Sequence, residues 1–285
     1  MKAKEKKRRG RGCLGRLLLL IIIVLGSMLA WGAILPEPET GVTAMTWLKD
    51  TPIAHRGLHT TEASENSLAA FEDAIQAGYA LECDLRLTAD GQIMVIHDDS
   101  LLRVCGQKGR VSKLTRAELA GYTLYGGESI PTLTELLELV DGRAPLLIEI
   151  KPAATSHQVV DKMLPMLDEY QGEFAIQSFD PWVCRYVKSL RPDWQVGLLD
   201  VGLGVGPNGL RLAFDKLLIN ICNPDFISYR YQALTPGLLD GYRAKGTAVL
   251  AYGTTEDDIG KTHWQDRTDN LIFDREPLIR LGEYK

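Results

Sequence analysis

The amino-acid sequence predicts an α/β fold, a (β/α)₈ TIM barrel that follows one N-terminal transmembrane helix. Short apolar runs typical of buried strands alternate about eight times with segments of helical period after residue 48. A doubly wound open sheet is the alternative, but no glycine-rich dinucleotide fingerprint follows any of these runs. The length of 285 residues suits one such barrel or two modest domains.

The N-terminal region carries the signals of a membrane anchor. Residues 1–16 hold eight Lys or Arg against one acidic residue, Glu5, and residues 17–35 contain no charged side chain. As a helix, the second segment would span roughly 28 Å, about the thickness of the hydrocarbon core. The positive charges before it predict a cytoplasmic N-terminus and a folded domain outside the cell membrane.

A cleavable signal peptide is the competing interpretation, because Ala30 and Gly32 place small residues near a potential cleavage point. Apolar residues continue to Leu35, which favours an uncleaved anchor. The prolines that follow indicate a short extended linker. The sequence thus predicts four parts: a basic cytoplasmic head (1–16), a transmembrane anchor (17–35), a linker (36–48) and the barrel (49–285).

The elements of the barrel follow from the periodicity, in order along the chain. The expected strands are 52–55, 80–85, 145–150, 174–177, 195–199, 226–228, 248–252 and 270–273. The expected helices are 67–78, 132–140, 156–170, 181–190, 209–217 and 235–245. Residues 87–97 are typical of a hairpin, with Asp90 and Gly91 at its turn.

Composition argues against some functions. The net charge is −5 although the head is strongly basic, so the remaining chain is acidic and no nucleic-acid partner is expected. The five cysteines fit no zinc-binding spacing. Cys83, Cys184 and Cys222 lie in or beside apolar segments, where buried free thiols are expected.

Two of the predicted strands carry ionisable side chains near their carboxyl ends. Glu82 and Asp84 are two residues apart, so both point to one face of a strand. The same spacing places Glu149 and Lys151 on one face of the next strand. Either pair alone would suit a surface ion pair, but the carboxyl ends of barrel strands meet at one mouth. We therefore expect the three carboxylates to bind a divalent cation, calcium or magnesium.

Two histidines follow apolar runs that end at the same mouth. His55 and His97 can exchange protons near neutrality, and Arg56 and Lys151 can neutralise phosphate oxygens. Together with a cation, these groups suit in-line displacement at phosphorus. One histidine would activate the nucleophile and the other would protonate the leaving oxygen. The residues thus predict a phosphodiesterase mechanism.

Seven segments carry a resemblance to a known family. In chain order they are "IAHRG", "ENSLAAFEDAIQAG", "LECDLRLTADGQIMVIHDDSLLRVC", "IPTLTELLELV", "LLIEIK", "QSFDP" and "LIFDREP". Their order and spacing over residues 53–277 resemble the pattern of the glycerophosphodiester phosphodiesterase family. The resemblance implies a barrel that uses a divalent cation to hydrolyse glycerophosphodiesters to sn-glycerol 3-phosphate and an alcohol.

The resemblance also implies roles, position by position. It implies that His55 and His97 are the acid/base pair and that Glu82, Asp84 and Glu149 bind the metal. Arg56, Asn66 and Lys151 would contact the substrate phosphate, with Glu65 and Tyr252 in supporting positions.

Two features depart from the family pattern. Tyr252 stands where the family commonly has a tryptophan, so the substrate wall differs. The segment between His97 and Pro131, a small insertion over the pocket in the family, is short here. Its Tyr122 and Tyr125 either line the pocket or belong to an ordinary surface loop.

Three functions remain open at this point. The first is an outward-facing, membrane-anchored phosphodiesterase of glycerophosphodiesters. A lysophospholipase D acting on membrane lysolipids is the alternative enzyme, because an anchor suits both. An inactive phosphodiester-binding module is the third, but every acid, base and ligand position of the family is filled in this chain.

Overall fold

The structure is a computed structural model that describes residues 26–27, 46–200, 217–234, 240, 242–244, 246–254 and 268–274. Among these residues, no helix combines the length and the hydropathy that a membrane crossing requires. The predicted transmembrane helix 17–35 lies outside the described residues except for Gly26 and Ser27. The predicted helices 209–217 and 235–245 also fall largely outside them.

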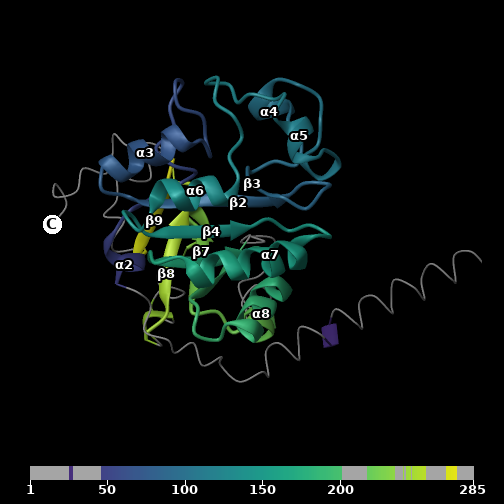
Figure 1. The fold of residues 1–285 in the computed structure, drawn as a ribbon. Coiled ribbons are helices and arrows are strands. Elements are labelled where there is room, and N and C mark those ends of the chain that lie inside the picture. The colour runs from purple at the N-terminus through teal and green to yellow at the C-terminus, as the bar shows by residue number, and fades with distance from the viewer. Residues whose placement is uncertain are drawn as a thin grey trace, which may run out of the picture. The chain divides into compact units, whose positions relative to one another are not determined.

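Eight parallel strands form one closed sheet (Figure 1). They are β1 (Ile53–Ala54), β2 (Ala80–Leu87), β4 (Leu146–Ile150), β5 (Phe174–Ser178), β6 (Val196–Asp200), β7 (Phe226–Arg230), β8 (Ala248–Tyr252) and β9 (Asn270–Phe273). Strand β1 pairs with both β2 and β9, so the sheet closes into a barrel. The predicted barrel is confirmed, and closure excludes the open doubly wound sheet. The short β3 (Ile93–Val95) pairs antiparallel with β2, which confirms the predicted hairpin.

Helices alternate with the strands, and their starts are specified locally. They are α3 (Leu68–Gln76), α6 (Leu133–Val140), α7 (Ser156–Glu169) and α8 (Pro181–Leu190). The Ser67 hydroxyl accepts a hydrogen bond from the Ala70 backbone N–H, and Thr132 forms a capping box with Glu135. Pro181 occupies the first turn of α8, where a missing N–H is tolerated. These caps explain why the predicted helix boundaries agree to within about two residues.

An apolar layer fills the N-terminal end of the barrel. Helix α2 (Trp47–Asp50) contributes Trp47 and Leu48, and the strands add Ile53, Ala80, Leu147, Ala175, Phe226 and Ile272. Because side chains alternate along a strand, the residue two positions further on lies one layer closer to the mouth. Those residues are His55, Glu82, Glu149, Gln177, Ser228 and Asp274. The fold therefore places a polar layer directly above a closed apolar floor.

Residues 96–130 form a packed insertion between β3 and α6. It contains α4 (Leu102–Cys105), the 3-10 turn η1 (Val111–Lys113) and α5 (Arg116–Leu119) (Figure 1). A hydrophobic cluster buries Met94, Ile96, Leu101, Val104, Val111, Leu119, Leu124 and Ile130. Tyr122 packs against this cluster, whereas the Tyr125 hydroxyl accepts a hydrogen bond from the Glu65 backbone N–H at 3.0 Å. The segment therefore has a hydrophobic cluster of its own, with Tyr122 against it and Tyr125 bonded to the loop after β1.

Gly57 and Gly78 offer a matched test of how closely α3 approaches the loop after β1. Both have a φ of +79°, which disfavours a side chain, but an added Cβ at Gly57 would lie 2.7 Å from the Ala70 carbonyl carbon. A Cβ at Gly78 would meet no atom within 4 Å. We expect Gly78→Ala to lower the free energy of unfolding by about 1 kcal/mol, and Gly57→Ala by about 2 kcal/mol more. Urea denaturation measures both losses, and equal losses would contradict the close approach.

Candidate active site

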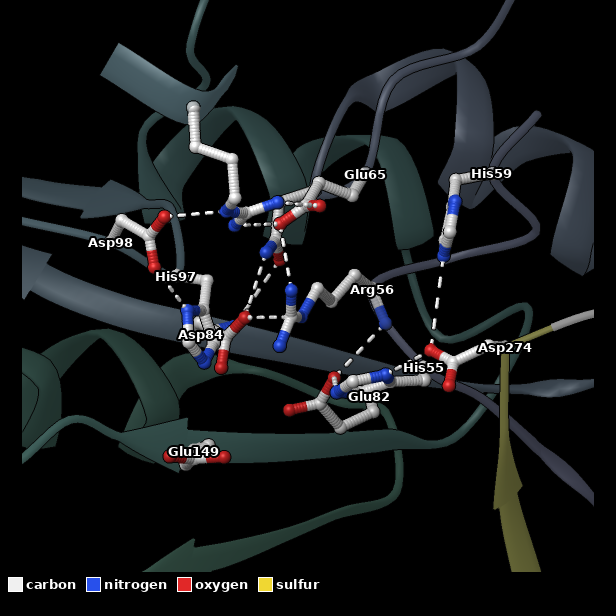
Figure 2. A network of polar contacts seen from close by, with 12 residues as sticks. His55, Arg56, His59, Glu65, Glu82, Asp84, His97, Asp98, Glu149 and Asp274 are labelled. Carbon is white, nitrogen blue, oxygen red and sulfur yellow. Dashed lines mark hydrogen bonds and ion pairs between the residues drawn. The ribbon is translucent and has the colours of Figure 1, made fainter. Parts of the chain in front are cut away.

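Strands β2 and β4 bring three carboxylates together above the apolar floor. Asp84 pairs with Glu149 in the register of the two strands, and Glu82 lies two residues before Asp84 on the same face. Ligand oxygens of all three lie within 4.8 Å of one another, and all three side chains are buried (Figure 2). Like charges this close in a buried site repel strongly, so the carboxylate cluster (Glu82, Asp84 and Glu149) needs positive charge beside it.

Two basic side chains lie against the carboxylate cluster. Lys151 Nζ lies 2.7 Å from Asp84 Oδ1 and 2.6 Å from Glu149 Oε1. Arg56 Nε lies 3.2 Å from Asp84 Oδ2, and the Arg56 backbone N–H donates to Glu82 at 3.0 Å. Burial alone would raise the pKa of Asp84, but Lys151 and Arg56 hold it well below its usual range.

The carboxylate cluster still holds more negative charge than these two cations neutralise. Burial and the neighbouring carboxylates raise the pKa of Glu82 well above its usual range. Burial and the charge of Asp84 likewise raise the pKa of Glu149. Glu82 Oε1 is buried and makes no hydrogen bond with any residue that the structure describes. A free buried oxygen among three carboxylates fits a hard divalent cation, which prefers oxygen ligands.

His55 and His97 flank the carboxylate cluster, and a further carboxylate holds the Nδ1 atom of each ring. His55 Nδ1 lies 2.5 Å from Asp274 Oδ1, and His97 Nδ1 lies 2.6 Å from Asp98 Oδ1 (Figure 2). A neutral ring whose Nδ1–H donates to a carboxylate has its lone pair on Nε2. His55 Nε2 lies 3.9 Å from Glu82 Oε2, so this atom faces the carboxylate cluster.

The two carboxylates that hold the histidines are ionised. Burial would raise the pKa of Asp274, but a hydrogen bond from His55 keeps it far below its usual range. Burial also opposes ionisation of Asp98, yet hydrogen bonds from Arg103 and His97 lower its pKa. Burial lowers the pKa of the His97 ring. A neutral His97 beside an anionic Asp98 is suited to accept a proton at neutral pH.

Arg56 and Asn66 hold the loop after β1 against the carboxylate cluster. Both have left-handed backbones, with φ of 60° and 57°, which is unfavourable for a residue that has a side chain. The Asn66 backbone N–H donates to the Arg56 carbonyl at 2.9 Å. Asn66 Nδ2 donates to Asp84 at 2.8 Å, and its Oδ1 accepts from the Asp84 backbone N–H at 3.2 Å. These bonds hold the strained loop so that both side chains face the site.

A chain of ion pairs joins the two sides of the site. Glu65 accepts a hydrogen bond from Arg56 at 2.8 Å and two from Arg103, at 2.5 and 2.8 Å. Arg103 Nε also donates at 2.6 Å to Asp98, which holds His97. Arg103, on α4 of the insertion, therefore connects the Arg56 side of the site with the His97 ring.

The structure brings nine of the ten predicted site residues into one network of hydrogen bonds and ion pairs. They are His55, Arg56, Glu65, Asn66, Glu82, Asp84, His97, Glu149 and Lys151. Tyr252 ends β8 and packs edge-on against Phe179, with ring centroids 6.1 Å apart, so it lies on the wall of the barrel.

Sequence reasoning missed Asp98, Asp274 and Arg103, which also belong to this network. Asp274 stands two positions after the inward-facing Ile272, and this spacing could have revealed it. No local pattern marks Arg103, because its partners Glu65 and Asp98 are set by the packing of the insertion.

Residues 55–275 match the model of the Glycerophosphoryl diester phosphodiesterase family. A glycerophosphodiester phosphodiesterase of Caldanaerobacter subterraneus subsp. tengcongensis is 35% identical over 248 residues, which cover 82% of this chain and 98% of that protein.

Two solved structures at 24% identity share the fold. A phosphodiesterase of Oleispira antarctica, in complex with the product sn-glycerol-3-phosphate, has a TM-score of 0.67 and covers 78% of this chain and 91% of its own. A glycerophosphodiester phosphodiesterase of Thermotoga maritima has a TM-score of 0.63 and covers 78% and 93%. The chain therefore belongs to the glycerophosphoryl diester phosphodiesterase family and is a phosphoric diester hydrolase.

Proposed function

We propose that the enzyme hydrolyses glycerophosphodiesters to sn-glycerol 3-phosphate and an alcohol with a divalent cation, calcium or magnesium. One observation carries the proposal: a buried carboxylate cluster lies between two histidines, and each histidine is held at Nδ1 by a further carboxylate. The relative at 35% identity is named for this activity, and the Oleispira antarctica structure contains sn-glycerol-3-phosphate as its product.

The groups around the carboxylate cluster are suited to bind a phosphodiester. A cation held by Glu82, Asp84 and Glu149 would supply Lewis-acid stabilisation of the phosphate oxygens. Arg56, Asn66 and Lys151 surround the same place with hydrogen-bond donors. Fixed donors of this kind stabilise the negative charge that builds up on the phosphate during displacement.

The two histidines divide the proton transfers in this proposal. One ring takes the proton of the attacking nucleophile at Nε2, and the other gives a proton from Nε2 to the departing alcohol oxygen. Asp274 and Asp98 orient the rings and stabilise the protonated state of each. The charge on each ring therefore changes while its position does not.

A lysophospholipase D acting on membrane lysolipids is the second candidate, because the same site chemistry would cleave both substrates. An inactive binding module is the third. Products from glycerophosphocholine and lysophosphatidylcholine distinguish them. Our proposal expects sn-glycerol 3-phosphate, the second candidate expects lysophosphatidic acid, and a binding module releases neither.

Removing one ligand of the carboxylate cluster should abolish metal-dependent turnover. We expect Glu82→Gln, Asp84→Asn and Glu149→Gln each to lower turnover at least about a hundredfold and to weaken cation binding. Without metal, Glu82→Gln should not lower the unfolding temperature, because it replaces a buried carboxyl whose charged form is disfavoured by burial and by its neighbours.

Calorimetric titration with calcium and magnesium, together with thermal unfolding, measures these effects. Glu138→Gln on the exposed face of α6 is the matched control and should change none of them. Full metal-dependent turnover in all three cluster variants would refute the metal site.

Replacement of either histidine should reveal which proton it handles. We expect His55→Ala and His97→Ala each to lower turnover about a hundredfold on glycerophosphocholine, with a smaller effect on KM. A p-nitrophenyl phosphodiester has a leaving group that needs little protonation, so the variant without the acid should recover much of its rate on it. The variant without the base should not recover.

Stopped assays on both substrates measure this difference. His157→Ala is the control, because this exposed ring stacks on Tyr186 of α8 and takes no part in the site network. Equal losses on both substrates for both site variants, with metal binding intact, would leave His55 and His97 as positioning groups.

The enzyme is further proposed to be anchored in the cell membrane by residues 17–35, with a cytoplasmic N-terminus and an external barrel. The charge imbalance before residue 17 and the uncharged segment after it support this topology. Protease added to intact cells should then digest the barrel while a cytoplasmic marker protein survives. A barrel that resists protease until the cells are lysed would refute the topology.

A further inference from the structure

A groove of about 420 Å³ adjoins the candidate active site on the side of the insertion. It lies between the end of β2, the turn η1 and the segment that leads from β4 into α7. The polar residues on its walls are Arg86, Asp99, Ser112, Lys113, Lys151 and Thr155. The rest of the lining is apolar and includes Leu85, Leu87 and Val159. Lys151 is shared with the carboxylate cluster, so the groove begins where the site ends.

Arg86 is the first of two basic side chains in this groove whose terminal nitrogens have no hydrogen-bond partner among the described residues. It lies on the same face of β2 as Glu82 and Asp84, one step further toward the mouth. Its Nε donates to the carbonyl oxygen of His97 at 2.6 Å. Its two Nη atoms make no hydrogen bond or ion pair with any described residue, although the side chain is half-buried.

Lys113 is the second basic side chain, and its Nζ likewise has no partner among the described residues. The acidic residue of the groove, Asp99, interacts with the charge of Arg86, but its hydrogen bond and its ion pair go to other residues. Asp99 pairs with Arg110 at 3.1 Å and accepts a hydrogen bond from the Ser112 backbone N–H at 2.9 Å. The groove therefore has a net positive wall beside a cluster of carboxylates.

We propose that this groove binds a second anionic group of the substrate, a phosphate carried by its alcohol half. The inference rests on the proposed function and specifies its substrate class. The groove is next to His97 and Lys151, so a substrate with its reacting phosphate at the carboxylate cluster would place its far end there. A half-buried guanidinium whose N–H groups have no acceptor can bind a phosphate through two hydrogen bonds. The enzyme should therefore prefer alcohols that carry a further phosphate.

Two soluble substrates test this preference. Glycerophosphoglycerol has one phosphate, and glycerophosphoglycerophosphoglycerol carries a second phosphate and a third glycerol on the same glycerol unit. After correction for its two equivalent scissile bonds, the longer substrate should have the higher kcat/KM in the full-length enzyme. Arg86→Gln should lower the ratio of the two kcat/KM values about tenfold, and Lys113→Gln about threefold. Arg86→Lys keeps the charge and should retain most of the preference.

Lys108→Gln is the matched control, because Lys108 is an exposed lysine of the same insertion outside the groove. It should leave the ratio unchanged. An equal loss on both substrates in Arg86→Gln would show that Arg86 acts only through the His97 carbonyl, and would overturn the inference. A ratio that neither Arg86→Gln nor Lys113→Gln changes would also overturn it.

Binding measurements distinguish a failure of this inference from a failure of the proposed function. Calorimetry in the presence of EDTA compares the two compounds without turnover. Tighter binding of glycerophosphoglycerophosphoglycerol that is weakened by Arg86→Gln supports the groove even if neither compound is hydrolysed. Equal binding of both compounds overturns the inference while the hydrolysis of glycerophosphoglycerol still supports the proposed function.

Discussion

Repulsion among the three carboxylates on β2 and β4 is the constraint on which the rest of the site depends. The register that pairs Asp84 with Glu149 makes the repulsion unavoidable, and the apolar floor below excludes water that would weaken it. Lys151 and Arg56 compensate only part of the charge. A divalent cation would complete the balance, and its binding would then be coupled to the folding of this end of the barrel.

Carboxylates outside the cluster also pair with basic side chains. Asp274 and Asp98 hold the histidines, while Glu65 is shared by Arg56 and Arg103. Arg56, Arg103 and Lys151 each pair with two acidic groups. Side chains in such a network restrict one another's rotamers, so the geometry of the site is set before substrate arrives.

Much of the fold and of this site could be predicted from sequence because the signals are local. Strand alternation placed Glu82 and Asp84 on one face, and helix caps fixed the start of α3 and α6. The packed insertion was not predicted, since its core is formed by short helices whose apolar residues show no sustained period. The role of Arg103 could not be predicted because its partner Glu65 comes from a distant segment that only tertiary packing brings close.

Closure of the barrel has a consequence for the timing of activity during biosynthesis. His55 lies at the end of the first strand, but its backbone N–H bonds to Phe273 and its ring to Asp274, at the end of the last strand. A nascent chain has made all three carboxylates of the cluster long before it has made Asp274, which orients this ring. With His55 in the role proposed above, the chain would gain its full hydrolytic site only when the last strand closes the barrel.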